Sequence, residues 1–184
     1  NQYTQAFMAL VGAERVFRLL DTKPDWADPA GAEPIAKVDG RVEFRDVSFG
    51  YDPNRLILHN VSFTAEPGQT IALVGHTGSG KTSITNLITK AYLPTSGVLL
   101  VDGHDITKVT TPSLRKHLGV VQQSNFLFEG TVLDNIRFSR PEATMAEVID
   151  AARKLDCLDL FETLPDGWNT QVGEAGNTLS LGQR

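Results

Sequence analysis

The sequence has few of the residues that form disulfides and metal sites. It contains one cysteine, Cys157, and 4 histidines among its 184 residues. One cysteine cannot form a disulfide within the chain, and no cluster of histidines accompanies it to bind zinc. We therefore expect Cys157 to pack among other side chains, in a protein that suits a reducing compartment.

Long apolar runs and an excess of basic residues are missing as well. No run approaches the roughly 20 apolar residues of a transmembrane helix, and the amino terminus lacks the regions of a signal peptide. Lysine and arginine number 17 against 22 acidic residues, which gives a formal net charge of −5. Because the basic residues are scattered among acidic ones, we expect no nucleic-acid partner.

What the sequence does contain is a phosphate-binding motif. Residues 75–82 read GHTGSGKT and fit the pattern G-x-x-x-x-G-K-[ST] at every fixed position. The glycines let backbone N–H groups turn inward around an anion. Lys81 would bring positive charge to the β and γ phosphates of a nucleotide, and the hydroxyl of Thr82 would bind a Mg²⁺ ion held between them.

The flanking residues agree with this motif. Residues 70–74 (TIALV) predict a short buried parallel strand that ends at the loop. Residues 81–93 carry apolar side chains along one helical face, before Pro94 and Gly97 end the helix. A helix that starts at the loop would add its dipole to the anion site. The alternative is a glycine-rich turn that binds nothing.

The amino-terminal part predicts a helix, a linker and a small antiparallel sheet. Residues 1–20 carry a helical apolar stripe, and residues 21–39 contain the prolines of an extended linker. Alternating apolar residues then predict strands, with a bulge between Phe44 and Val47 where the alternation changes phase. Tyr51 follows at a turn, where it would either cover apolar surface or serve as a platform for an adenine ring.

The second half predicts two more strands and then helices. Residues 98–101 and 119–121 are apolar strand candidates, and the second delivers Gln122 and Gln123 to its carboxyl end, where ligands bind in open α/β sheets. An amide there could bind Mg²⁺ or orient a water, or it could simply be a polar residue that leaves a strand. Two capping boxes predict helix starts further on: Thr131 with Asp134, and Thr144 with Glu147.

Taken together, these motifs resemble the nucleotide-binding domain of an ABC transporter of the exporter type, in which membrane and ATPase domains share one chain. Residues 179–183 (LSLGQ) are similar to the family's LSGGQ signature, and residues 119–136 are very close to the exporter pattern around the Q-loop. Tyr51 matches the family's adenine-stacking aromatic. Residues 170–176 resemble the exporter loop that touches the membrane domain, and residues 14–21 (ERVFRLLD) resemble the junction after the last membrane helix.

The resemblance implies an α/β fold: a P-loop NTPase core with an amino-terminal antiparallel β subdomain and a helical subdomain. Residues 1–20 would be a helix that continues from a membrane domain, residues 21–39 a linker, and residues 40–184 a partial ABC ATPase domain with its helical subdomain at about 126–184. We expect the carboxyl-terminal part of the core to follow Arg184. It would hold the Walker B strand with its Mg²⁺-binding Asp, the Glu that polarises the attacking water, and the switch His.

The resemblance also implies a set of site residues. Lys81 and Gln123 would be catalytic, and Thr82 and Gln123 would bind the metal. Leu181 stands where the family usually has glycine, and this departure puts the competence of the signature in question. The residues expected to contact ATP are Tyr51, Gly75, His76, Thr77, Gly78, Ser79, Gly80, Lys81, Thr82, Ser83, Gln123, Ser180, Gly182 and Gln183.

We therefore expect the ATPase motor of an exporter, with ATP and Mg²⁺ as cofactors and the 184-residue chain binding ATP without the hydrolytic residues. Its partners would be the transmembrane domain of the same longer chain and a second nucleotide-binding domain, at the cytoplasmic face of the cell (inner) membrane. Two alternatives stay open. One is a soluble P-loop kinase or GTPase, and the other is a catalytically degenerate regulatory half of an asymmetric transporter.

Overall fold

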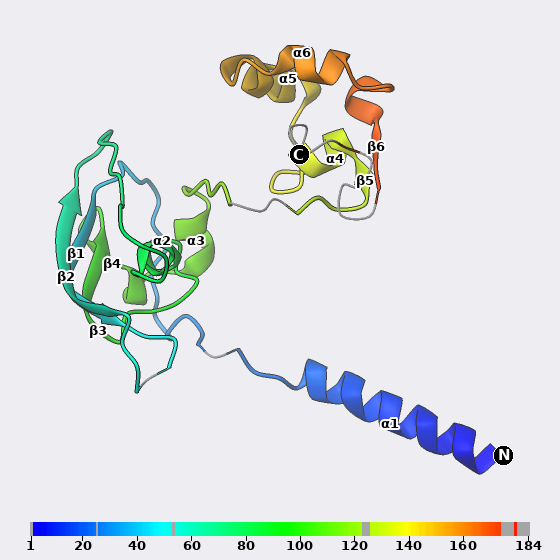
Figure 1. The fold of residues 1–184 in the computed structure, drawn as a ribbon, viewed down its shortest axis with the longest axis horizontal. Helices are drawn as coiled ribbons and strands as arrows, with labels where there is room; N and C mark the ends of the chain where they lie inside the picture. The colour runs from blue at the N-terminus through cyan, green and yellow to red at the C-terminus, as the bar shows by residue number, and fades with distance from the viewer. Residues whose placement is uncertain (1, 25, 53, 123–125, 174–178, 180–184) are drawn as a thin grey trace. The chain divides into compact units, whose positions relative to one another are not determined.

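The structure is a computed structural model that describes residues 2–24, 26–52, 54–122, 126–173 and 179. The chain divides into two compact units, Asn1–Gly119 and Val120–Arg184 (Figure 1). Within the described ranges, no helix combines the length and the apolar character that crossing a bilayer requires.

The predicted amino-terminal helix is present as α1, Gln2–Leu20. Many of its apolar side chains are exposed in this structure, for example Tyr3 at 93% and Leu19 at 76%. The described residues of the expected linker, 21–24 and 26–39, form no regular helix or strand, apart from an isolated parallel bridge between Glu33 and Val109. That α1 continues from a membrane domain stays a prediction.

A four-stranded sheet in the order β2-β1-β3-β4 forms the body of the first unit. The predicted bulge in β1 is confirmed, because the pairing with β2 shifts between Phe44 and Val47 and Asp46 adopts a φ of 50°. Gly97 of β3 passes so close to the carbonyl of Asp46 that a Cβ would collide with it. The bounds of the strands are β1 Val42–Phe49, β2 Leu58–Ala65, β3 Ser96–Val101 and β4 His104–Asp105, and all the pairings are antiparallel.

Two helices cover one face of this sheet: α2, Lys81–Ile88, and α3, Thr111–Arg115 (Figure 1). A short 3₁₀ helix, Ile106–Lys108, joins β4 to α3. Apolar burial explains the arrangement, since each of these elements presents its apolar face to one shared core. The members of that core that are fully enclosed, at 2% exposure or less, are Phe44, Val47, Leu87, Leu99, Val101, Ile106 and Leu114.

The prediction of parallel strands on both sides of the phosphate loop's helix was wrong for this structure. Residues 70–74 and 119–121 form no strand, and Val74 and Val121 are 89% and 94% exposed. A strand exists only where a neighbouring strand accepts its hydrogen bonds, and the described residues supply no such neighbour. The helix predicted over residues 81–93 also ends earlier, at Ile88.

The second unit is mainly helical, as predicted. Both capping boxes are confirmed. The hydroxyls of Thr131 and Thr144 accept from the backbone N–H of the third helical residue, Asp134 or Glu147, and the carboxylate of that residue accepts from the backbone N–H of the threonine. A small core encloses Val132, Leu164 and Val172. The elements are β5 Gly130–Thr131, α4 Val132–Ile136, α5 Met145–Lys154, α6 Leu158–Glu162, a 3₁₀ helix Gly167–Asn169, and β6 Gln171–Val172, which pairs with β5.

Candidate nucleotide-binding site

The phosphate loop lies between residues 70–74, which are exposed except for the half-buried Leu73, and the start of α2. Gly78 and Gly80 have φ values of 83° and 92°, in the left-handed region that favours glycine. Gly80 is also buried against β2, where an added Cβ would lie 2.6 Å from Cδ2 of Leu58. The backbone conformation therefore favours glycine at both positions, and at Gly80 the packing of the loop on the sheet requires it as well.

The ammonium group of Lys81 lies inside this loop. Its Nζ donates hydrogen bonds to the carbonyl oxygens of Gly75 at 2.8 Å and His76 at 2.9 Å, and it lies 3.5 Å from Oγ of Ser79. These bonds wrap the loop around the side chain at the first residue of α2. A cation at this place adds to the partial positive charge of the helix end, so the loop favours an anion.

The space beside the loop is open. A Cβ added to Gly78 would meet no atom within 4 Å, and residues 74–79 are all exposed. Thr82 is exposed as well, directly after Lys81, and its hydroxyl is the kind of oxygen ligand that Mg²⁺ accepts. The donors and the access therefore fit a chain of phosphate groups with a Mg²⁺ ion.

Tyr51 belongs to the same region of the first unit. Its ring is 49% exposed and packs edge-on against Phe49 and Tyr92, with both centroid distances at 4.9 Å. Its phenol oxygen lies 3.2 Å from Oγ of Ser83 and accepts a hydrogen bond of 3.1 Å from Nδ2 of Asn86. The ring is thus held by its hydroxyl to α2, and part of it remains free to meet a ligand.

Four of the predicted site residues lie outside the described residues: Gln123, Ser180, Gly182 and Gln183. Their roles therefore stay predictions. Two residues next to them are described. Gln122, which precedes Gln123, is exposed, and Leu179, which precedes Ser180, is buried at 7% exposure in the core of the second unit.

The sequence did not predict the two residues that support Tyr51, which are Asn86 and Tyr92. Asn86 lies three residues after Ser83, a spacing that places two side chains side by side on a helix. That spacing is the only sequence signal that could have found it. Tyr92 follows α2, and no local pattern relates it to an aromatic residue before β2.

The sequence is similar to ABC transporter proteins over most of its length. The sequence profile described as ABC transporter matches residues 58–184. An ABC transporter ATP-binding protein of Bacillus subtilis, YfiC, is 44% identical over 184 residues, which is 100% of this chain and 30% of that protein. The β-(1→2)glucan export ATP-binding/permease protein NdvA of Rhizobium etli is 46% identical over 181 residues, 98% of this chain and 31% of that protein.

A solved structure agrees with these relatives. The structure of a bacterial Atm1-family ABC exporter with ATP bound superposes with a TM-score of 0.87 at 40% identity, over 98% of this chain and 32% of that one. The chain belongs to the ABC transporter family, and its α/β fold matches the nucleotide-binding domain of the exporter type. It spans about 30% of the length of the relatives it matches. Membership of this family excludes the alternative that the chain is a soluble P-loop kinase or GTPase.

Proposed function

We propose that the chain is the ATP-binding motor domain of an exporter, and that the complete protein couples ATP hydrolysis to the movement of a substrate across a membrane. The observation that carries this proposal is the phosphate loop folded around Lys81, whose Nζ lies 2.8 Å and 2.9 Å from the carbonyl oxygens of Gly75 and His76. The family match and the exporter relatives support the same assignment.

Different residues of this chain would bind different parts of the nucleotide. The backbone N–H groups of residues 75–80 and the ammonium group of Lys81 would hold the phosphates, and Tyr51 would offer its exposed ring to the base. Thr82 and Gln123 would hold Mg²⁺, which neutralises charge on the phosphoryl group when it is bound. Ser83, which follows the loop in α2, would support Tyr51, because its hydroxyl contacts the phenol oxygen of that residue.

We further propose that the site is completed by a second nucleotide-binding domain. Ser180 and Gly182 lie about a hundred residues after Lys81 along the chain. In a head-to-tail pair, each ATP would contact the phosphate loop of one domain and residues 179–183 of the other, and a two-fold axis would create both sites at once. ATP binding would draw the two domains together and hydrolysis would release them, at the cytoplasmic side of the membrane.

A degenerate regulatory domain is the second candidate function, and Leu181 is the observation that favours it. A leucine side chain at a position where the family usually has glycine hinders the approach of backbone N–H groups to the γ-phosphate. In that case the domain would bind ATP and support a catalytic partner. The residue that follows the Walker B strand in the complete protein distinguishes the two, since hydrolysis requires a Glu there.

The experiment is a mixed pair in the complete protein. One subunit carries Lys81→Ala and the other carries Ser180→Arg, and the ATPase activity of the purified heterodimer is measured. If signature and phosphate loop meet across the pair, both changes fall on one composite site and the other stays whole, so activity persists. If Ser180 acts within its own subunit, each site carries one change, and loss of all activity would contradict the proposal. Homodimers of each variant serve as inactive controls.

A further inference from the structure

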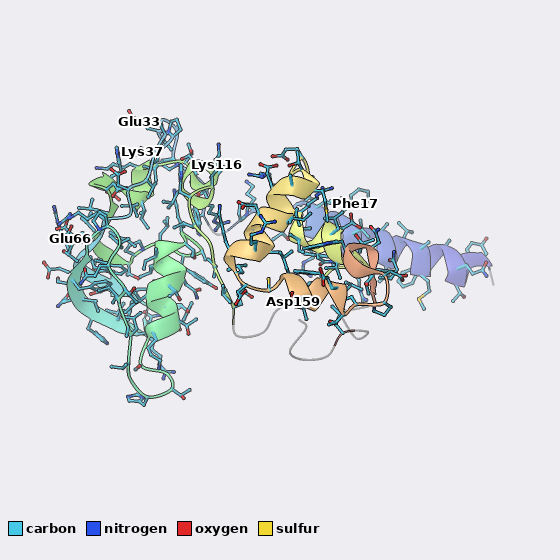
Figure 2. The ribbon with its side chains drawn as sticks, turned by 90° about the horizontal axis from the view of Figure 1, so that it is seen from above. Phe17, Glu33, Lys37, Glu66, Lys116 and Asp159 are labelled. Carbon is cyan, nitrogen blue, oxygen red and sulfur yellow. The ribbon has the colours of Figure 1, made fainter. Side chains whose placement is uncertain are left out.

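Residues 26–35, here called the strap, contact α3 and the segment that directly follows α2 in the first unit. The indole Nε1 of Trp26 donates to the carbonyl oxygen of Ala91, just after α2, at 3.4 Å. The backbone N–H of Glu33 donates to the carbonyl oxygen of Lys108 at 3.0 Å, and that of Ile35 donates to Oγ of Ser113 in α3 at 3.0 Å. Figure 2 labels Glu33 on this strap.

Lys90 is the unusual residue under the strap. It follows the carboxyl end of α2, adopts a φ of 51°, and is 0% exposed. Its Nζ donates to Oδ1 of Asp28 at 2.8 Å and to the carbonyl oxygen of Val109 at 2.5 Å, and it lies 5.4 Å from the centre of the Trp26 ring. An ammonium group is buried in this way only when such partners compensate for lost water.

Asp28 is the residue that joins the strap to both helices. Besides the bond from Lys90, its carboxylate accepts the backbone N–H of Thr111 at 2.8 Å and the Thr111 hydroxyl at 2.6 Å. Hydrogen bonds from Lys90 and Thr111 lower the pKa of Asp28 from 3.8 to about 2. One carboxylate therefore holds together the strap, the end of α2 and the first residue of α3.

Both helices are also fastened to each other at this end. Arg115 of α3 donates through Nε to the carbonyl oxygen of Thr89 at 3.1 Å and through Nη2 to that of Lys90 at 2.9 Å. The opposite end of α2 begins with Lys81 of the phosphate loop. Because α2 is a single helix of 8 residues, a shift of its carboxyl end moves its amino end with it.

We propose that Asp28 and Lys90 are positioning residues, whose ion pair couples the attachment of residues 26–35 to nucleotide binding at the other end of α2. The inference rests on the proposed function, because it takes ATP as the ligand of the phosphate loop. Coupling between two sites is reciprocal, so attachment of the strap strengthens ATP binding by the same factor by which ATP strengthens the attachment of the strap. The strap follows α1 in the chain and thus gives the segment before it a mechanical connection to the phosphate loop.

The test compares four forms of the full chain with the wild type: Asp28→Asn, Lys90→Met, the double variant, and Asp39→Asn. Asparagine keeps an acceptor for Thr111 and methionine keeps the length of lysine, so the double variant removes the ion pair without leaving a charge buried alone. Asp39→Asn is the control, because Asp39 of the linker pairs with Lys37 in an exposed ion pair. The measurements are the Kd for ATP, the exchange rate of the Glu33 amide with and without ATP, and the temperature of unfolding.

In the wild type and in Asp39→Asn, we expect ATP to slow exchange of the Glu33 amide. In the double variant we expect stability close to that of the wild type, an ATP affinity lowered about fivefold or more, and an amide whose exchange no longer responds to ATP. The single variants, each with one unpaired group, should also unfold at lower temperature. If the ion pair only stabilised the fold, the double variant would recover wild-type ATP affinity together with wild-type stability.

Two failures are distinguishable. Wild-type affinity and ATP-dependent protection in the stable double variant would overturn the coupling and leave the proposed function standing. If the wild-type chain binds no ATP at all, the proposed function is overturned, and the coupling with it.

Discussion

The phenol oxygen of Tyr51 lies 3.2 Å from the hydroxyl oxygen of Ser83, so an aromatic residue before β2 is bonded to the third residue of α2. Ser83 is only 4% exposed. This contact fixes the distance between the proposed base platform and the proposed phosphate site. It also shows that Ser83 supports Tyr51 in this structure, while the contact of Ser83 with ATP that the family resemblance implied stays a prediction.

Replacing Tyr51 with alanine should weaken ATP binding about tenfold or more, because stacking of a base on an aromatic ring contributes roughly 1–3 kcal/mol. Tyr51→Trp should bind ATP like the wild type, and GTP should bind measurably, since stacking tolerates any base. Titration of the full chain with ATP and with inorganic tripolyphosphate measures the effect. Tripolyphosphate affinity should stay unchanged, and equal ATP affinities in Tyr51→Ala and the wild type would contradict the stacking role.

Removing the Tyr51 hydroxyl should show how much its hydrogen bond to α2 contributes to the free energy of unfolding. Tyr51→Phe and Asn86→Ala each delete one partner of the 3.1 Å hydrogen bond, and each should destabilise the chain by about 1 kcal/mol. Because the same bond is lost in both, the double variant should cost less than the sum of the two. Urea unfolding of the wild type and the three variants measures this. Strictly additive losses would show that the two groups do not interact.

Gly80→Ala should destabilise the first unit by about 1–3 kcal/mol, because a Cβ would meet Leu58 at 2.6 Å and the φ of 92° is strained for alanine. Gly12→Ala is a control at a helical glycine without crowding, since its Cβ in α1 would meet no atom within 4 Å. In a helix that change should be neutral or stabilising. Thermal unfolding compares the two, and equal melting temperatures for both variants would contradict the packing of the loop on β2.

Acid should weaken the attachment made by Asp28. Its pKa is about 2 in the folded chain against an ordinary value of 3.8, so its contribution is complete above about pH 4 and is lost as pH falls toward 2. Over that window the stability advantage of the wild type over Asp28→Asn should shrink by about 2 kcal/mol. Urea unfolding at pH 5 and pH 2.5 measures it. Lys90→Met should show a smaller dependence, because it lacks the main cause of the lowered pKa; an unchanged advantage at pH 2.5 would contradict the assignment.

Local patterns predicted what depends on neighbouring residues. The capping boxes at Thr131 and Thr144 and the bulge after Phe44 all follow from spacings of a few residues. The phosphate loop was predictable for the same reason, because its glycines and Lys81 form one contiguous motif. The family resemblance then supplied the fold class and the exporter type.

What the sequence could not predict depends on partners that are distant along the chain. Residues 70–74 have the composition of a buried strand, but composition does not supply the neighbouring strand that would pair with them. Lys90 is a residue type that is almost never fully buried without a partner, and that partner, Asp28, lies 62 residues away in a segment that reads as linker. The support of Tyr51 by Asn86 likewise joins residues 35 positions apart.

The most direct test of the account is calorimetric titration of the full chain with Mg-ATP, in the wild type, in Lys81→Ala and in Lys154→Ala. Lys154 is the matched control, a lysine of α5 that pairs with Asp150 on an exposed helix face. If the loop around Lys81 is a nucleotide site, the wild type and Lys154→Ala should bind ATP alike, and Lys81→Ala should lose about tenfold or more in affinity, as expected for a charge-assisted contact. Equal ATP affinities in all three proteins would contradict the central claim.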